Sequence, residues 1–171
     1  MQNTSSYISA FSRLGQFLSQ FPEGRKPWAE APLYLSELNK VHFKEFAEIL
    51  ESEPILNPWF TNDSLTKALK GIASMLKEEV LKQWLGPYGI ESLASEAQLT
   101  VGLVMAGNIP LVGFHDMMSV LASGHRVLAK PSSKDDRLIR KVAEVLADID
   151  SEIGSRISFT DDKLSGMDAV I

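Results

Sequence analysis

The sequence predicts an α/β protein in which an α-rich region over residues 1–99 precedes a parallel β-α-β-α-β layer over residues 100–171. Two observations carry this prediction. Before Thr100, apolar residues recur every three or four positions, which is typical of amphipathic helices. After Thr100, short continuous apolar runs alternate with helical patterns, which is the order that a parallel sheet with right-handed crossovers requires.

Prolines and glycines divide the α-rich region into helical segments. The predicted helices cover residues 7–21, 35–50, 65–76 and 80–85. Pro22 is expected to end the first, and the second, which consists of one or two helices, is expected to stop before Pro54, because proline lacks a backbone N–H donor. The polar side chains of residues 61–64 can cap the third helix, and the Gly-Pro-Tyr-Gly sequence of residues 86–89 ends the fourth.

The second part of the chain is predicted to form strands joined by crossover helices. Strands are expected at residues 100–106, 126–130, 156–160 and 167–171, and helices at 111–124 and 134–150. Gly124 is expected to form the C-cap of the first of these helices. Because the last predicted strand runs to Ile171 with nothing to cover it, we expect the chain to be the N-terminal piece of a longer protein.

Composition and charge exclude several classes of function. The chain has no cysteine, so disulfides, thiolate zinc sites and a cysteine nucleophile are ruled out within these 171 residues. Its net charge of −5 is spread evenly, so no nucleic-acid partner is expected. No apolar run reaches the roughly 20 residues that cross a bilayer, and the N-terminus carries no secretory pattern. We therefore expect a cytoplasmic protein without a membrane span.

Polar residues follow two of the predicted strands. The candidate binding residues are Gly107 and Asn108 in the first turn, and Lys130, Ser132 and Ser133 at the second. Ligands of parallel α/β sheets bind at the carboxyl ends of the strands, so both turns are expected to face one ligand. Spacing alone favours a plainer interpretation, in which Gly-Asn forms a turn, the serines cap the next helix and the lysine extends into solvent.

A longer motif contains both turns. The segment from Val101 to Asp136, VGLVMAGNIPLVGFHDMMSVLASGHRVLAKPSSKDD, closely resembles the cofactor-domain core of the LuxC-type fatty acyl-CoA reductases, which belong to the aldehyde dehydrogenase superfamily. GNIPL stands in place of the superfamily's first turn, SGHRVLAKP matches the second half, and Ser133 stands where many relatives have glutamate. The NPWF tetrapeptide of residues 57–60 resembles the N-terminal region of the same reductases, so the resemblance covers Asn57 to Ile171.

The resemblance implies a truncated Rossmann-like layer of the aldehyde dehydrogenase type, NADPH as cofactor, and acyl-CoA or a related acyl donor as the substrate of the parent protein. It gives the Asn108 amide the role of binding the oxyanion of a thiohemiacetal formed on a catalytic cysteine. Lys130 would bind the adenosine ribose or its 2′-phosphate. The Ser133 hydroxyl can donate to that phosphate, whereas glutamate would repel it, and Gly107 and Ser132 complete the implied cofactor-binding set.

Several parts of the family's machinery are missing from this chain. These are the nucleophilic cysteine, the acid–base carboxylate and the glycine-serine turn beneath the pyrophosphate. The chain is therefore expected to be an inactive N-terminal part of an NADPH-dependent acyl-CoA reductase. Two alternatives stay open: a noncatalytic interaction or regulatory module derived from the same fold, and a fragment of an acyl-phosphate reductase. The uncovered last strand predicts a homo-oligomer formed through the sheet edge.

The remaining polar candidates give weaker signals. His42 is expected on a solvated helix surface, and His115 and Asp116 are expected to be structural because adjacent helical residues point about 100° apart. His125 is expected near the amino edge of the sheet, and Asp161 in a turn that could line the cofactor groove. The three histidines lack ligand-like spacing, so no metal site is predicted.

Overall fold

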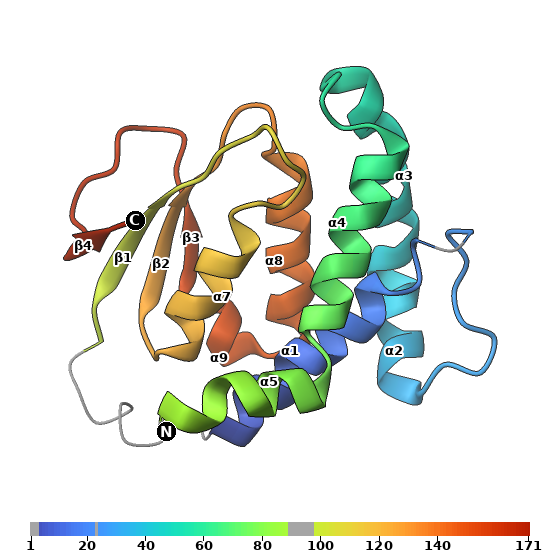
Figure 1. The fold of residues 1–171 in the computed structure, drawn as a ribbon, viewed down its shortest axis with the longest axis horizontal. Helices are drawn as coiled ribbons and strands as arrows, with labels where there is room; N and C mark the ends of the chain where they lie inside the picture. Colours follow the sequence, from blue (N-terminus) through green and yellow to red (C-terminus); the bar gives the residue numbers. More distant parts are fainter. Residues whose placement is uncertain (1–3, 23, 89–97) are drawn as a thin grey trace.

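A computed structural model describes residues 4–22, 24–88 and 98–171. It contains a four-stranded sheet in which every pair of neighbouring strands is parallel, together with two groups of helices. In Figure 1 the sheet lies at one side of the molecule, helices α7, α8 and α9 lie next to it, and the N-terminal helices lie beyond them. The predicted α/β class is confirmed.

The N-terminal helices follow the predicted order. They are α1 (Thr4–Leu18), α2 (Leu33–Leu38), the π-helix η1 (Asn39–Phe43), α3 (Lys44–Leu56), α4 (Asn62–Met75), α5 (Glu78–Leu85) and the 3-10 turn η2 (Gly86–Tyr88). Thr61 caps α4, its hydroxyl oxygen accepting a hydrogen bond from the Ser64 N–H at 3.1 Å. Helix α5 ends at Leu85 and the 3-10 turn η2 follows, which confirms the predicted break as far as Tyr88. Gly89 lies outside the described residues.

Two predicted helix ends are wrong. Helix α1 ends at Leu18, before Pro22 is reached, and α3 continues past Pro54 to Leu56. Within α3 the Asn57 N–H still donates to the Glu53 carbonyl at 2.8 Å, so Pro54 removes one donor without ending the helix. Packing of the apolar side chains of α3 outweighs this local loss, because tertiary contacts supply most of the stability of a helix in a protein.

The strands and crossover helices also follow the predicted order. They are β1 (Thr100–Val104), α7 (Phe114–Ala122), β2 (Arg126–Lys130), α8 (Arg137–Ile149), α9 (Ser151–Gly154), β3 (Ile157–Phe159) and β4 (Ala169–Val170). The C-cap of α7 is Ser123, one residue before the predicted Gly124. Gly124 follows it with a φ of +84°, the left-handed conformation that commonly ends a helix, and its N–H donates to the Leu121 carbonyl. Helix α7 begins at Phe114, three residues later than predicted, because residues 111–113 form a turn.

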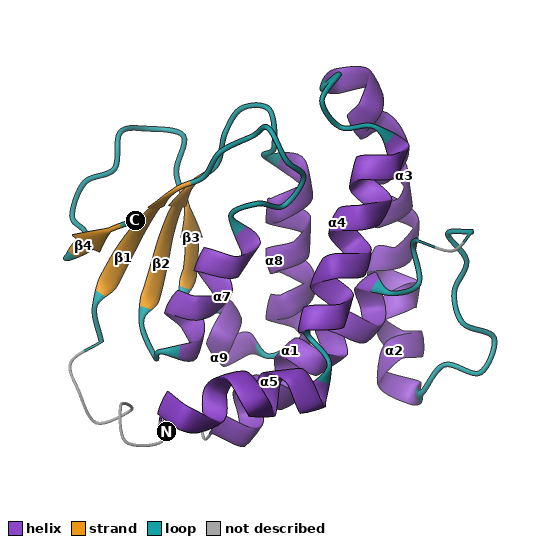
Figure 2. Ribbon diagram, viewed as in Figure 1, coloured by secondary structure: helices purple, strands orange, loops and turns teal. Residues whose placement is uncertain are grey.

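The strand order is β3-β2-β1-β4. The chain moves in one direction through β1, β2 and β3 and then crosses back to place β4 on the other side of β1. This reversal makes the space between β1 and β4 the topological switch point, where ligands of open α/β sheets bind. Right-handed crossovers in one direction put α7 and α8 on the same face of the sheet, as Figure 2 shows.

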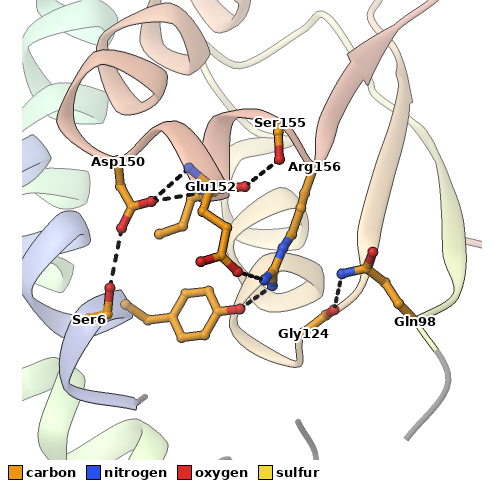
Figure 3. Close-up of polar contacts among 9 residues, drawn as sticks. Ser6, Gln98, Gly124, Asp150, Glu152, Ser155 and Arg156 are labelled. Carbon is orange, nitrogen blue, oxygen red and sulfur yellow. Dashed lines mark hydrogen bonds and ion pairs between the residues drawn. The ribbon is translucent and has the colours of Figure 1, made fainter. Parts of the chain in front are cut away.

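One hydrophobic core joins the two regions predicted from the sequence. Its buried side chains include Phe11 and Phe17 of α1, Val127 of β2 and Val142 of α8. Polar contacts add to this connection: Ser6 donates to Asp150 at 3.2 Å (Figure 3), and Arg156 donates to the Tyr7 hydroxyl oxygen. The strands begin at Thr100, as predicted. Helix α1 of the first region packs against helix α8 of the second.

The face of the sheet opposite α7 and α8 is more open. Gly102 is covered there by Leu164 and Met167 of the β3–β4 loop, whereas Val104 keeps 65% of its surface exposed. Strand β4 forms one edge of the sheet, and Val170 within it is 58% exposed. Within the described ranges, no helix is both long enough and apolar enough to cross a bilayer.

Candidate functional site

The turns that leave β1 and β2 touch each other at Gly107. A β-carbon added to Gly107 would lie 2.6 Å from Ser132 Cβ and 3.1 Å from Lys134 Cβ, which is too close for a residue with a side chain. The Met105 N–H donates to the Lys130 carbonyl at 3.0 Å and extends the ladder between the strands up to this contact. The prediction that the two turns lie together at the carboxyl edge of the sheet is confirmed.

Asn57 joins both turns to the α-rich region. This side chain, at the end of α3, is buried, and its Nδ2 donates to the Lys134 carbonyl at 2.9 Å and to the Gly107 carbonyl at 3.3 Å. Its Oδ1 accepts the Trp59 N–H at 3.1 Å. In the sequence, Asn57 stands out only as the first residue of the NPWF tetrapeptide, and no periodicity or spacing marks it as a support of the turns.

Asp135 also supports the first turn, through a hydrogen bond to its backbone. Its Oδ2 accepts the backbone N–H of Leu111 at 2.8 Å, and Leu111 has a φ of +58°, a left-handed conformation that is costly for a leucine. Burial raises the pKa of Asp135 to about 6; the Leu111 hydrogen bond opposes this shift, and the negative charges of Glu53 and Asp136 add to it. The helix predicted over 134–150 includes Asp135, whereas α8 begins at Arg137 and leaves Asp135 in the preceding turn.

Asn108 lies in the first turn with its side chain exposed. Among residues 4–22, 24–88 and 98–171, no hydrogen bond of its amide is recorded, so the N–H groups are free to donate to a ligand in the isolated chain. The turn follows β1 directly and therefore lies beside the switch point between β1 and β4. Asn108 is thus well placed to bind a ligand at this edge of the sheet.

Lys130 is half-buried at the last position of β2. Val127 and Ala129 are buried on the face that the helices cover, so strand alternation directs Lys130 to the opposite, more open face. No ion pair of its ammonium group is recorded among the described residues, and a cation without a protein partner suits an anionic group such as a 2′-phosphate.

The two serines differ in their surroundings. Ser132 is half-buried, and its Oγ accepts the Lys134 N–H at 3.3 Å, while Ser133 is exposed. Helix α8 begins only at Arg137, after Asp136 in the N-cap position, so neither serine caps it. The plainer interpretation of the serines as caps of α8 is wrong, because residues 132–135 form a separate turn closed by the Asp135 N–H and the Ser132 carbonyl.

The structure places other sequence candidates away from this site. His42 is 1% exposed, and its Nε2 lies 2.8 Å from Asp148 Oδ2 of α8, so the prediction of a solvated histidine is wrong. His125 lies before β2, where its Nδ1 accepts the Leu99 N–H at 3.3 Å, as expected for the amino edge of the sheet. Asp161 forms an ion pair with Arg140 of α8 at 2.7 Å, so its carboxylate already has a partner within the protein.

No group of three or more His, Cys, Asp or Glu side chains that could hold a metal ion occurs among the described residues. Comparisons with protein-family models, with curated proteins and with solved structures found no match to this chain.

Proposed function

We propose that this chain is the N-terminal part of an NADPH-dependent acyl-CoA reductase, in which it supplies an oxyanion-binding amide and the adenosine side of the cofactor site. The observation that carries the proposal is the contact of Gly107 with Ser132, because it brings the Asn108 turn and the end of β2 to one edge of the sheet. The resemblance of residues 101–136 to the LuxC-type reductases supports the same assignment.

Asn108 would act on the reacting carbonyl. In such a reductase, a cysteine thiolate from outside these 171 residues attacks the thioester carbonyl, a carbon–sulfur bond forms, and the CoA thiolate leaves. Bound NADPH would supply a hydride to the carbonyl carbon, after which the carbon–sulfur bond to the cysteine would break, releasing the aldehyde and restoring the thiolate. Negative charge develops on the carbonyl oxygen in both steps, and an amide N–H directed at that oxygen typically contributes a factor of ~100–1,000 in rate.

Lys130 and Ser133 would act on the cofactor. An ammonium group attracts a 2′-phosphate, and a serine hydroxyl can donate to it, whereas the ribose of NADH offers no such charge. The half-buried position of Lys130 at the strand end, without a recorded ion pair among the described residues, leaves its charge for a ligand. This combination favours NADPH over NADH.

Binding of the adenosine half of the cofactor tests this assignment on the chain as it exists. We expect 2′-phospho-ADP-ribose to bind more tightly than ADP-ribose, and Lys130→Ala to weaken the former by roughly 10- to 150-fold through loss of a charge-assisted contact. Lys26→Ala removes the same charge from an exposed connector and should change neither affinity. Equal affinities for the two ligands, or equal effects of the two lysine variants, would refute the cofactor assignment.

The catalytic assignment requires the complete reductase. There, Asn108→Ala should lower kcat by about 100- to 1,000-fold while leaving the NADPH affinity nearly unchanged, because the amide acts on charge that is present mainly in the transition state. Lys130→Ala should weaken NADPH binding while leaving kcat nearly unchanged. An unchanged kcat for Asn108→Ala would return that residue to the role of a turn former.

A specific observation also favours a noncatalytic interaction module as the second candidate. Parallel sheets are usually covered on both faces, yet Val104, Val170 and Ile171 are all largely exposed here. If these residues bind another protein and the chain has no reductase role, neither ADP-ribose ligand should bind, and this result would separate the two candidates.

A further inference from the structure

A buried acid, Asp135, holds the turn that carries Asn108, and a second buried acid, Glu53 of α3, acts on it through its charge. Asp135, which precedes α8, and Glu53 each expose only 4% of their surface. Asp135 Oδ1 and Glu53 Oε1 are buried without a hydrogen-bond partner among the described residues. The exposed Arg137 has its Nη1 3.8 Å from Glu53 Oε1. This guanidinium therefore partly offsets the charge of Glu53.

Asp135 controls the backbone of the turn through one hydrogen bond. Its carboxyl oxygen holds the Leu111 N–H, and Leu111 is buried in a left-handed conformation that leucine rarely adopts. Pro110, just before it, lacks an N–H and fixes its own φ, so the segment from Asn108 to Leu111 has few alternatives that keep all of its polar groups satisfied. Without the Asp135 carboxyl, the Leu111 N–H would be buried and unpaired.

We propose that Asp135 is a positioning residue for Asn108, and that loss of the Asp135 proton loosens the turn as the pH rises. A neutral Asp135 can be buried beside the turn at little cost, whereas its carboxylate there lacks water and feels the charge of a second buried acid. Opening of the turn lets water reach the charge. The closed turn is thus favoured at low pH and becomes less stable as the pH rises.

The charges around Asp135 agree with this direction. The pKa of Asp135 is raised to about 6, mainly by burial, with the negative charges of Glu53 and Asp136 acting in the same direction and the Leu111 hydrogen bond opposing them. Burial also raises the pKa of Glu53, while the Arg137 charge lowers it. Because these pKa values are raised in the closed state, the stabilisation is complete below the ordinary pKa of a carboxyl group and is lost as the pH rises through about 6.

The importance of this coupling for catalysis rests on the proposed function, but the coupling itself is measured without any cofactor. Amide hydrogen exchange at Leu111, expressed as a protection factor so that the intrinsic pH dependence cancels, reports opening of the turn. Between pH 5 and 7.5 we expect protection at Leu111 to fall about tenfold, from the pKa of about 6 in the closed state and an ordinary carboxyl pKa in the open state.

Asp135→Asn is the decisive variant, because the amide keeps an oxygen for the Leu111 N–H and cannot ionise. It should make the protection at Leu111 independent of pH, and Glu53→Gln should shift the wild-type transition to lower pH. Asp116→Asn changes an exposed acid in the first turn of α7 and should leave the wild-type behaviour intact.

Three results would overturn the proposal. These are a pH-independent protection factor at Leu111 in the wild type, the same pH dependence in Asp135→Asn as in the wild type, and a parallel loss of protection at Val142 in the middle of α8, which would indicate global unfolding. Failure to bind 2′-phospho-ADP-ribose would refute the proposed function and leave these exchange results unchanged, so the two failures are distinguishable.

Discussion

The side-chain amide of Asn57 donates a hydrogen bond of 2.9 Å to the backbone carbonyl of Lys134, 77 residues further along the chain. The same nitrogen reaches the Gly107 carbonyl, so one residue of the α-rich region supports both turns of the candidate site. The site is therefore built by both regions, and its geometry depends on how α3 packs beside the sheet.

Asn57→Ala should lower the free energy of unfolding by about 2–3 kcal/mol, because the Gly107 and Lys134 carbonyls would lose their donor in a buried place. Urea unfolding measures this change. Asn62→Ala removes an exposed asparagine that accepts a surface hydrogen bond from Arg25, and it should cost less than about 0.5 kcal/mol. Equal losses for the two variants would contradict a supporting role for Asn57.

Gly107→Ala should destabilise the chain by about 1–3 kcal/mol, since the new methyl group would overlap Ser132. Ser132→Gly removes the Cβ and Oγ that it meets, so the double variant should recover part of the loss. Gly71→Ala is the matched control: it lies in α4 with open space around it and should stabilise by about 0.5–1 kcal/mol. Additive effects of the two substitutions at Gly107 and Ser132 would count against direct contact of the turns.

Asp135→Asn should stabilise the protein more at high pH than at low pH. The raised pKa of Asp135 in the folded state means that its stabilisation is present below pH 3.8 and is lost as the pH rises through about 6. The difference in unfolding free energy between variant and wild type should therefore grow by about 2 kcal/mol between pH 4 and 7. Unfolding curves at several pH values give this difference, and a constant difference would argue that Asp135 is not buried as an acid.

The chain should show no reduction of acyl-CoA by NADPH, because the covalent catalysis on a thioester that the proposed function involves needs a thiolate and these 171 residues contain no cysteine. Loss of absorbance of NADPH at substrate saturation is the measurement, with a preparation free of host reductases. Turnover above the background of a mock purification would refute the assignment of the nucleophile to another segment.

The β4 edge should make the chain associate with itself, because β4 pairs with β1 on one side only and Val170 within it is largely exposed. Light scattering should show dimers or larger species that increase with concentration. Val170→Lys places a charge at this edge and should shift the population toward monomer, whereas Val41→Lys, at an exposed position of the π-helix η1, should not. A strictly monomeric wild type at high concentration would contradict this expectation.

The sequence by itself determined the order and type of the elements. The three-to-four residue spacing from Tyr7 to Phe21 encodes a helix with one buried stripe, and short apolar runs such as the one within Arg126–Lys130 encode strands. The meeting of the turns after β1 and β2 also followed from the sequence, since parallel neighbouring strands end at the same edge. These properties depend on residues that are close in the chain.

Only the tertiary structure decided which polar residues are buried and what they hold. His42 carries the pattern of a surface residue and becomes buried because Asp148, 106 positions away, lies beside it on α8. Asn57 and Asp135 likewise gain their roles from the backbone of distant turns. A hydrogen bond between remote segments leaves no periodicity in either one, because its energy depends on where packing of the whole core brings the two groups.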